Sequence, residues 1–107
     1  MTDISTGGNV VTIINVFTVD PAKQQKLVDI LVEATEQTMK HLPGFISANI
    51  HRSLDGVKVV NYAQWESREA FEAMRANPAA IPHMKAAAAL AKFDPIVCEV
   101  VEAIDRG

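Results

Sequence analysis

The sequence predicts an α+β domain in which one four-stranded antiparallel sheet carries helices on one face. Four segments rich in β-branched and aromatic residues are typical of strands, and the segments between them have helical periodicity or helix-capping signals. Their order, β-α-β-β-α-β, is the ferredoxin-like arrangement. With 107 residues the chain has the size of one domain, expected over residues 10–107 after a flexible lead at 1–9.

The first strand is expected over residues 10–19, a segment dominated by valine and isoleucine. Both of its faces are largely apolar, which indicates that something covers each side of the sheet. Asp20 and Pro21 then offer a capping carboxylate and a proline suited to the first helical position. An apolar stripe at three- and four-residue steps predicts a helix that ends near Leu42, before a Pro-Gly pair.

The two middle strands are expected over residues 45–53 and 57–66, because the Leu-Asp-Gly segment at 54–56 is a strong hairpin signal. Ser67 is placed to cap a short helix that runs through Ala76.

The second helical region is interrupted by Asn77 and Pro78, and an alanine-rich segment to about Ala91 then predicts a further helix. Pro82 lies inside that segment and predicts either a kink or a late start of the helix. The last strand is expected over residues 93–104.

One face of the predicted sheet is left without a helical cover, since the helices pack on the other face. Ile50, Val60 and Tyr62 are candidates for this uncovered surface. A large apolar patch rarely faces water, so the sequence predicts a two-fold homodimer in which two sheets pack together.

Composition excludes several classes of function. The net charge is -3 and the ten Lys and Arg residues are scattered, which argues against nucleic-acid binding. No apolar run approaches the roughly 18 residues of a membrane span, so no membrane partner is expected. The N-terminus lacks a basic segment followed by an apolar one, and Cys98 is the single cysteine, expected as a buried small hydrophobe. A cytoplasmic location is therefore expected.

No metal site is predicted, because one cysteine and three histidines are too few and too widely spaced. Glycine-rich phosphate loops, nucleophile elbows and dinucleotide fingerprints are also missing from the sequence.

Polar groups on otherwise apolar strand faces are the candidate site residues. Asn61 and Trp65 share one face of the third strand, where they bring an amide and an indole N–H. Asn15 shares a face of the first strand with Phe17, and asparagine is disfavoured in mid-strand. Each such group bonds either the protein itself or a ligand, and the sequence leaves both readings open.

His51 depends on the register of the hairpin. A two-residue loop places His51 opposite Val60, whereas a three-residue loop pairs it with Asn61, because a one-residue slip changes the face. His83 follows Pro82 and is compatible with either orientation.

The segments 43–48 (PGFISA) and 59–67 (VVNYAQWES), together with His51 and the Asp55-Gly56 turn, resemble the antibiotic biosynthesis monooxygenase family. The resemblance implies a dimeric α+β barrel with a pocket between sheet and helices. It implies a small aromatic substrate of phenolic, anthrone or hydroquinone type that O2 oxidises to a quinone. It also implies that no flavin, haem or metal takes part.

The same resemblance implies roles for residues. Asn61 and Trp65 would donate hydrogen bonds to the substrate's oxygens, and His51 would carry a proton, which requires the three-residue loop. A tyrosine of one family member is replaced here by Phe71. We expect the pocket to be lined by Asn15, Phe17, Phe71, Met74 and His83.

Two alternatives remain. Haem-degrading monooxygenases of the same superfamily are similar at Asn15 and at His83, which would be an axial haem ligand, although Met74 lacks the aromatic ring expected there. The third possibility is a dimeric binder of small aromatic ligands without catalytic activity.

Overall fold

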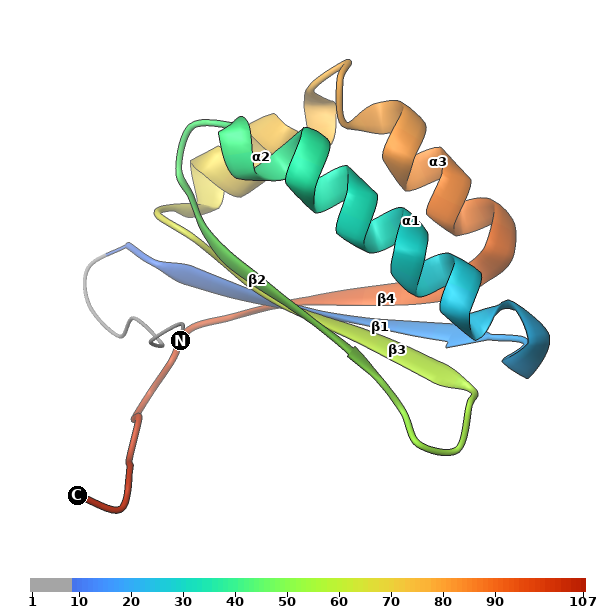
Figure 1. Cartoon of the computed structure of the whole chain (residues 1–107). Coiled ribbons are helices and arrows are strands. Elements are labelled where there is room, and N and C mark those ends of the chain that lie inside the picture. The colour runs from blue at the N-terminus through green and yellow to red at the C-terminus, as the bar shows by residue number, and fades with distance from the viewer. Residues whose placement is uncertain (1–8) are drawn as a thin grey trace.

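A computed structural model describes residues 9–107 and confirms the predicted fold. Its helices and strands are β1 (Val11–Val19), α1 (Gln24–Gln37), β2 (Phe45–Arg52), β3 (Lys58–Trp65), α2 (Arg68–Ala76), α3 (Ile81–Leu90) and β4 (Ala91–Cys98). The strands form one antiparallel sheet in the order β2-β3-β1-β4. Figure 1 shows α1, α2 and α3 together on one face of this sheet.

The helix ends follow the predicted local signals. Asp20 accepts a hydrogen bond from the backbone N–H of Ala22 at 2.9 Å, and a 3-10 turn at Pro21–Lys23 leads into α1. The last predicted turn of that helix is a separate 3-10 turn, Met39–His41. Ser67 caps α2 through the N–H of Ala70, at 3.1 Å.

The alanine-rich helix α3 starts late, as one of the two readings of Pro82 predicted. Pro82 stands in the first turn of the helix, where its missing N–H costs no helical hydrogen bond.

The β2–β3 hairpin has the two-residue register, since His51 pairs with Val60. The three-residue alternative, which the family resemblance required, is wrong. Gly56 adopts a φ of 86°. The Asp55 carboxylate accepts hydrogen bonds from the Ser53 hydroxyl at 2.6 Å and from the backbone N–H of Val57 at 3.2 Å. These hydrogen bonds, of which the one from the Ser53 hydroxyl has the largest effect, lower the pKa of Asp55 below its ordinary value of 3.8.

The last strand is shorter than predicted. β4 ends at Cys98, which pairs with Thr12, and only Val11 of β1 lies beyond this pair. Residues 99–107 form no strand, and Figure 1 shows them running away from the sheet. Cys98 itself is only partly buried, contrary to expectation, because it lies at the end of an edge strand. Of the lead predicted at 1–9, all but Asn9 lies outside the described residues.

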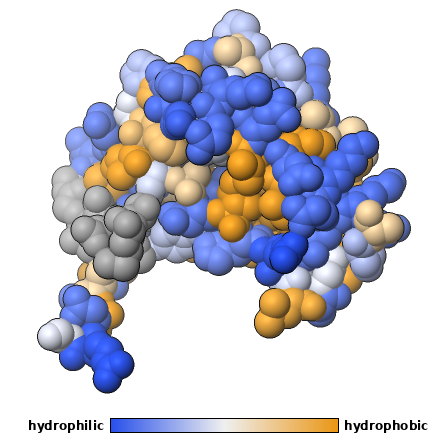
Figure 2. All heavy atoms as spheres, viewed as in Figure 1, coloured by the Kyte–Doolittle hydropathy of each residue, from blue (hydrophilic) through white to orange (hydrophobic). Residues whose placement is uncertain are grey.

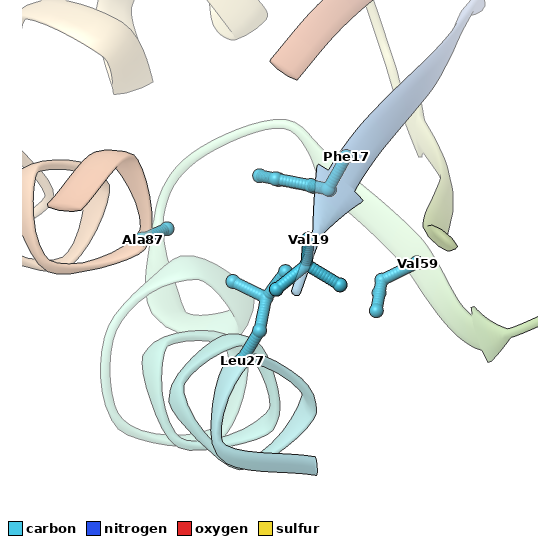
Figure 3. Packing of buried hydrophobic residues seen from close by; sticks show 5 residues of the cluster. All are labelled: Phe17, Val19, Leu27, Val59 and Ala87. Atoms are coloured by element: carbon cyan, nitrogen blue, oxygen red, sulfur yellow. The ribbon is translucent and has the colours of Figure 1, made fainter. Parts of the chain in front are cut away.

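The core consists of two clusters between the sheet and the helices. Figure 3 shows the first, in which Leu27 of α1 and Ala87 of α3 point toward the strands that carry Phe17, Val19 and Val59. The second cluster is formed by Ile13, Trp65 and Phe71. Figure 2 shows apolar residues gathered beneath a largely hydrophilic helical layer. No helix within residues 9–107 is long and apolar enough to cross a membrane.

Candidate active site

A cavity of about 290 Å³ lies between the sheet and the helices and is partly open to solvent. This volume is near the lower end of the range for small-molecule sites, roughly 300–1,000 Å³. Its lining is mainly apolar. The lining residues are Ile13, Asn15, Phe17, Leu31, Ala34, Thr35, Met39, Phe45, Ala48, Asn61, Ala63, Trp65, Phe71, Met74, Arg75, His83, Met84, Ala87, Phe93 and Pro95.

Two asparagines face each other on the strand side of the cavity. Asn15 of β1 and Asn61 of β3 are direct cross-strand partners, so both amides project from the same face of the sheet. Each Oδ1 is buried and has no hydrogen-bond partner among the described residues. A buried acceptor without a donor costs about 1–3 kcal/mol. The cavity thus offers two paired acceptors to hydroxyl or N–H groups of a ligand.

Trp65 forms a rigid part of the wall. Its side chain is only 2% exposed, and its ring meets Phe45 edge to face, with centroids 5.4 Å apart and planes at 88°. The indole N–H donates no hydrogen bond to residues 9–107. It is a fixed donor that remains free for a ligand in the cavity.

His51 lies on the opposite face of the sheet, because it pairs with Val60 and not with Asn61. Its side chain is exposed, and its Nδ1 lies 3.1 Å from the carbonyl oxygen of Asn49. The expected position of His51 beside Asn61 is therefore wrong. Ile50 takes the place opposite Asn61 and packs against the helix-covered core, so its expected position on the uncovered face of the sheet is also wrong.

His83 lines the cavity from the first turn of α3, and its Nε2 lies 3.0 Å from the hydroxyl oxygen of Thr38. Phe17, Phe71 and Met74 line the cavity as well. All five residues expected to bind substrate, including Asn15, thus meet around one space.

Arg75 was not anticipated. Its guanidinium carbon lies 5.6 Å from the centroid of the Phe71 ring, and its side chain borders the same cavity. Its spacing of four residues from Phe71 on one helix is the signal that would have found it. A guanidinium next to an apolar cavity favours a ligand that carries negative charge.

Among residues 9–107, no group of three or more His, Cys, Asp or Glu side chains is placed to hold a metal ion. The chemistry of the cavity is instead that of hydrogen bonds, one imidazole and one guanidinium around an apolar space.

Comparison with known proteins matches this architecture. A family model described as antibiotic biosynthesis monooxygenase matches residues 10–90. Tetracenomycin-F1 monooxygenase from Streptomyces glaucescens is 47% identical over 100 residues, which cover 94% of this chain and 89% of that protein.

Solved structures of similar fold include two proteins of related sequence. A monooxygenase from the gene ActVA-Orf6 of Streptomyces coelicolor, in complex with nanaomycin D, is 33% identical with a TM-score of 0.81, covering 92% of this chain and 93% of that one. SnoaB, a cofactor-independent oxygenase from Streptomyces nogalater, is 26% identical with a TM-score of 0.75, covering 91% of this chain and 98% of that one.

Proposed function

Because the chain belongs to the antibiotic biosynthesis monooxygenase family, we propose that it uses O2 to oxidise an aromatic polyketide of anthrone type to a quinone. It is a monooxygenase of the cofactor-independent kind, to which the similar SnoaB belongs. The substrate class is supported by the relatives, one named for tetracenomycin F1 and one bound to nanaomycin D.

The electron balance explains why no cofactor is required. The ring CH2 of an anthrone becomes C=O, which removes four electrons from the substrate and gives them to O2. One oxygen atom enters the new carbonyl group, and the other leaves as water with the two hydrogens of the CH2. Once deprotonated, the electron-rich aromatic can itself donate an electron to O2, so the protein must promote ionisation and stabilise the anion.

The main structural support for this proposal is the pair of unsatisfied amide oxygens of Asn15 and Asn61. They accept hydrogen bonds from phenolic hydroxyls and so orient the ring system in the cavity. The indole N–H of Trp65 donates to the oxygen on which negative charge develops, and the largely apolar walls limit the water around that charge.

Haem binding has less support than the cofactor-free reaction. The Nε2 of His83, which would ligate haem iron, already contacts the hydroxyl of Thr38 at 3.0 Å. Met74 supplies no aromatic ring to the cavity.

O2 uptake by the metal-stripped protein with dithranol, an anthrone, tests the proposal. Wild type should exceed the uncatalysed rate, and Trp65→Phe, which keeps an aromatic ring but removes the N–H, should lower kcat roughly 10²–10³-fold. Calorimetric titration under anaerobic conditions reports binding separately. Binding without uptake above background would favour the non-catalytic binder of small aromatic ligands.

We also propose that two copies pair through the uncovered face of the sheet. That face carries the partly buried Ile14, Val16, Val60 and Tyr62 and the 46% exposed Ile96. The extended tail adds Val101 and Ile104, which are 88% and 86% exposed. Light scattering should give twice the 11.6 kDa of one chain, and Val16→Lys should reduce that mass by half.

A cytoplasmic location is part of the same proposal, supported by the single cysteine.

A further inference from the structure

We propose that His83 is the general base that removes the proton from the substrate, and that Thr38 is the residue that positions its imidazole. This inference rests on the proposed oxygenase function and assigns its proton-transfer step to one side chain.

The contact between His83 and Thr38 fixes the imidazole from one side. Thr38 directly follows α1, and its own backbone N–H donates to the carbonyl of Ala34 at 3.0 Å, so its hydroxyl is held by the helix end. That hydroxyl oxygen lies 3.0 Å from Nε2 of His83. The imidazole is thus held between α1 and α3 at the wall of the cavity.

The second ring nitrogen is the one left for chemistry. A neutral imidazole has one N–H donor and one nitrogen with a free lone pair. When the Nε2–H of His83 donates to the Thr38 hydroxyl oxygen, the lone pair resides on Nδ1. Nδ1 makes no hydrogen bond to residues 9–107, so it is available to accept a proton.

No other residue lining the cavity in the described part of the chain can take this role. His83 and Arg75 are the only ionisable side chains of the lining, and a guanidinium is always protonated. Phe71 has no hydroxyl group to relay a proton. His51, the proton carrier expected from the family resemblance, lies on the other face of the sheet.

The charges at the cavity suit the substrate anion that the proton transfer creates. No carboxylate lines the cavity. Thr35 of α1 and Arg75 of α2 line it, and the hydroxyl of Thr38, directly after α1, contacts His83. The guanidinium of Arg75 favours an anionic substrate. Its charge is offset in part by the carboxylate of Glu72, whose Oε2 lies 3.7 Å from Nη1 of Arg75, and both side chains of this ion pair are about half exposed.

The proton transfer to His83 and the electron transfer to O2 account for every bond and electron of the step. The bond between the substrate and its acidic hydrogen breaks, an N–H bond forms at Nδ1, and the electron pair stays on the aromatic ring system. O2 then receives the electrons, and the proton returns from the imidazolium to the oxygen atom that leaves as water.

The experiment compares wild type with His83→Gln and His83→Asn, measuring the pH dependence of O2 uptake with dithranol. Gln retains a donor for Thr38 but cannot act as a base. Both variants should lower kcat roughly 10²–10⁴-fold, and their residual rate should rise with pH as the substrate ionises unaided. Trp65 is the only tryptophan of the chain, so quenching of its fluorescence reports ligand binding. Under anaerobic conditions, both variants should bind dithranol nearly as tightly as wild type.

Thr38 supplies the matched pair for the positioning role. Thr38→Val should lower kcat and change the acid limb of the pH profile with little effect on KM, whereas Thr38→Ser should restore both. Wild-type kcat and pH profile in folded His83→Gln and His83→Asn would overturn the assignment of the base while leaving the oxygenase function intact. An inactive wild type would overturn both.

Discussion

Asn15 and Asn61 are direct partners across β1 and β3, and neither side-chain oxygen has a hydrogen-bond partner among the described residues. Two such groups side by side destabilise a folded protein unless a ligand satisfies them. Unsatisfied acceptors of this kind are typical of sites that are preorganised for binding a ligand.

Replacing one of these amides by an apolar side chain of similar shape should therefore stabilise the protein and abolish its activity. For Asn61→Leu we expect the free energy of unfolding to rise by about 1–3 kcal/mol, because an unsatisfied acceptor disappears. Urea denaturation at fixed protein concentration measures the gain, and O2 uptake with dithranol measures the loss.

Thr12→Val is the matched control on the other face of the same sheet. The hydroxyl of Thr12 accepts a buried hydrogen bond from Gln64 at 3.0 Å, so its loss should destabilise the protein. If Asn61→Leu were destabilised as much as Thr12→Val, the Asn61 amide would be a satisfied structural group.

His51→Ala should retain wild-type kcat, since the two-residue hairpin register places the imidazole on the face opposite the cavity. Steady-state O2 uptake compares this variant with His83→Gln. A large loss of kcat in His51→Ala would support the proton carrier implied by the family resemblance and contradict the register seen in the structure.

Gly44 and Gly56 provide a comparison of two glycines with nearly the same φ, 85° and 86°. A methyl group at Gly44 would collide with the side chain of Ala70 in α2, whereas at Gly56 it would meet only Pro21 at 3.6 Å. Gly56→Ala should cost about 1–2 kcal/mol, the penalty of a left-handed backbone. Gly44→Ala should cost clearly more in thermal or urea denaturation. Equal losses would show that the collision is relieved at no cost.

The hairpin turn should weaken in acid. The pKa of Asp55 is lowered in the folded protein by the Ser53 hydroxyl and the Val57 N–H, so the stabilisation by its carboxylate is complete above the ordinary value of 3.8. It is lost as the pH falls below 3.8 through the lowered pKa. Stability measured between pH 5 and pH 2.5 should therefore depend less on pH in Asp55→Asn than in wild type. Parallel curves for the two proteins would exclude this contribution.

Local signals in the sequence predicted the elements, because caps and breakers act within a few residues. Asp20, Ser67 and Pro82 each fix a helix start by contacts inside one turn. The end of β4 was mispredicted because a strand requires a partner, and β1 extends only one residue, Val11, beyond the Thr12–Cys98 pair.

The site was predictable as a set of residues but not as an arrangement. The face that Asn61 and Trp65 share follows from the period of the strand. The pairing of Asn61 with Asn15 depends on the β1–β3 register, and the position of His51 depends on the length of one turn. The contact of His83 with Thr38 joins residues 45 positions apart, which no local pattern reveals.

Oxidation of dithranol under ¹⁸O2 by metal-stripped wild-type protein tests whether the chain is a cofactor-independent oxygenase. We expect one O2 consumed per quinone formed, one ¹⁸O atom in the new carbonyl group, no accumulation of hydrogen peroxide, and loss of the enzymatic rate in Asn61→Ala. An unlabelled product with hydrogen peroxide in solution, or a wild-type rate equal to that of Asn61→Ala, would contradict it.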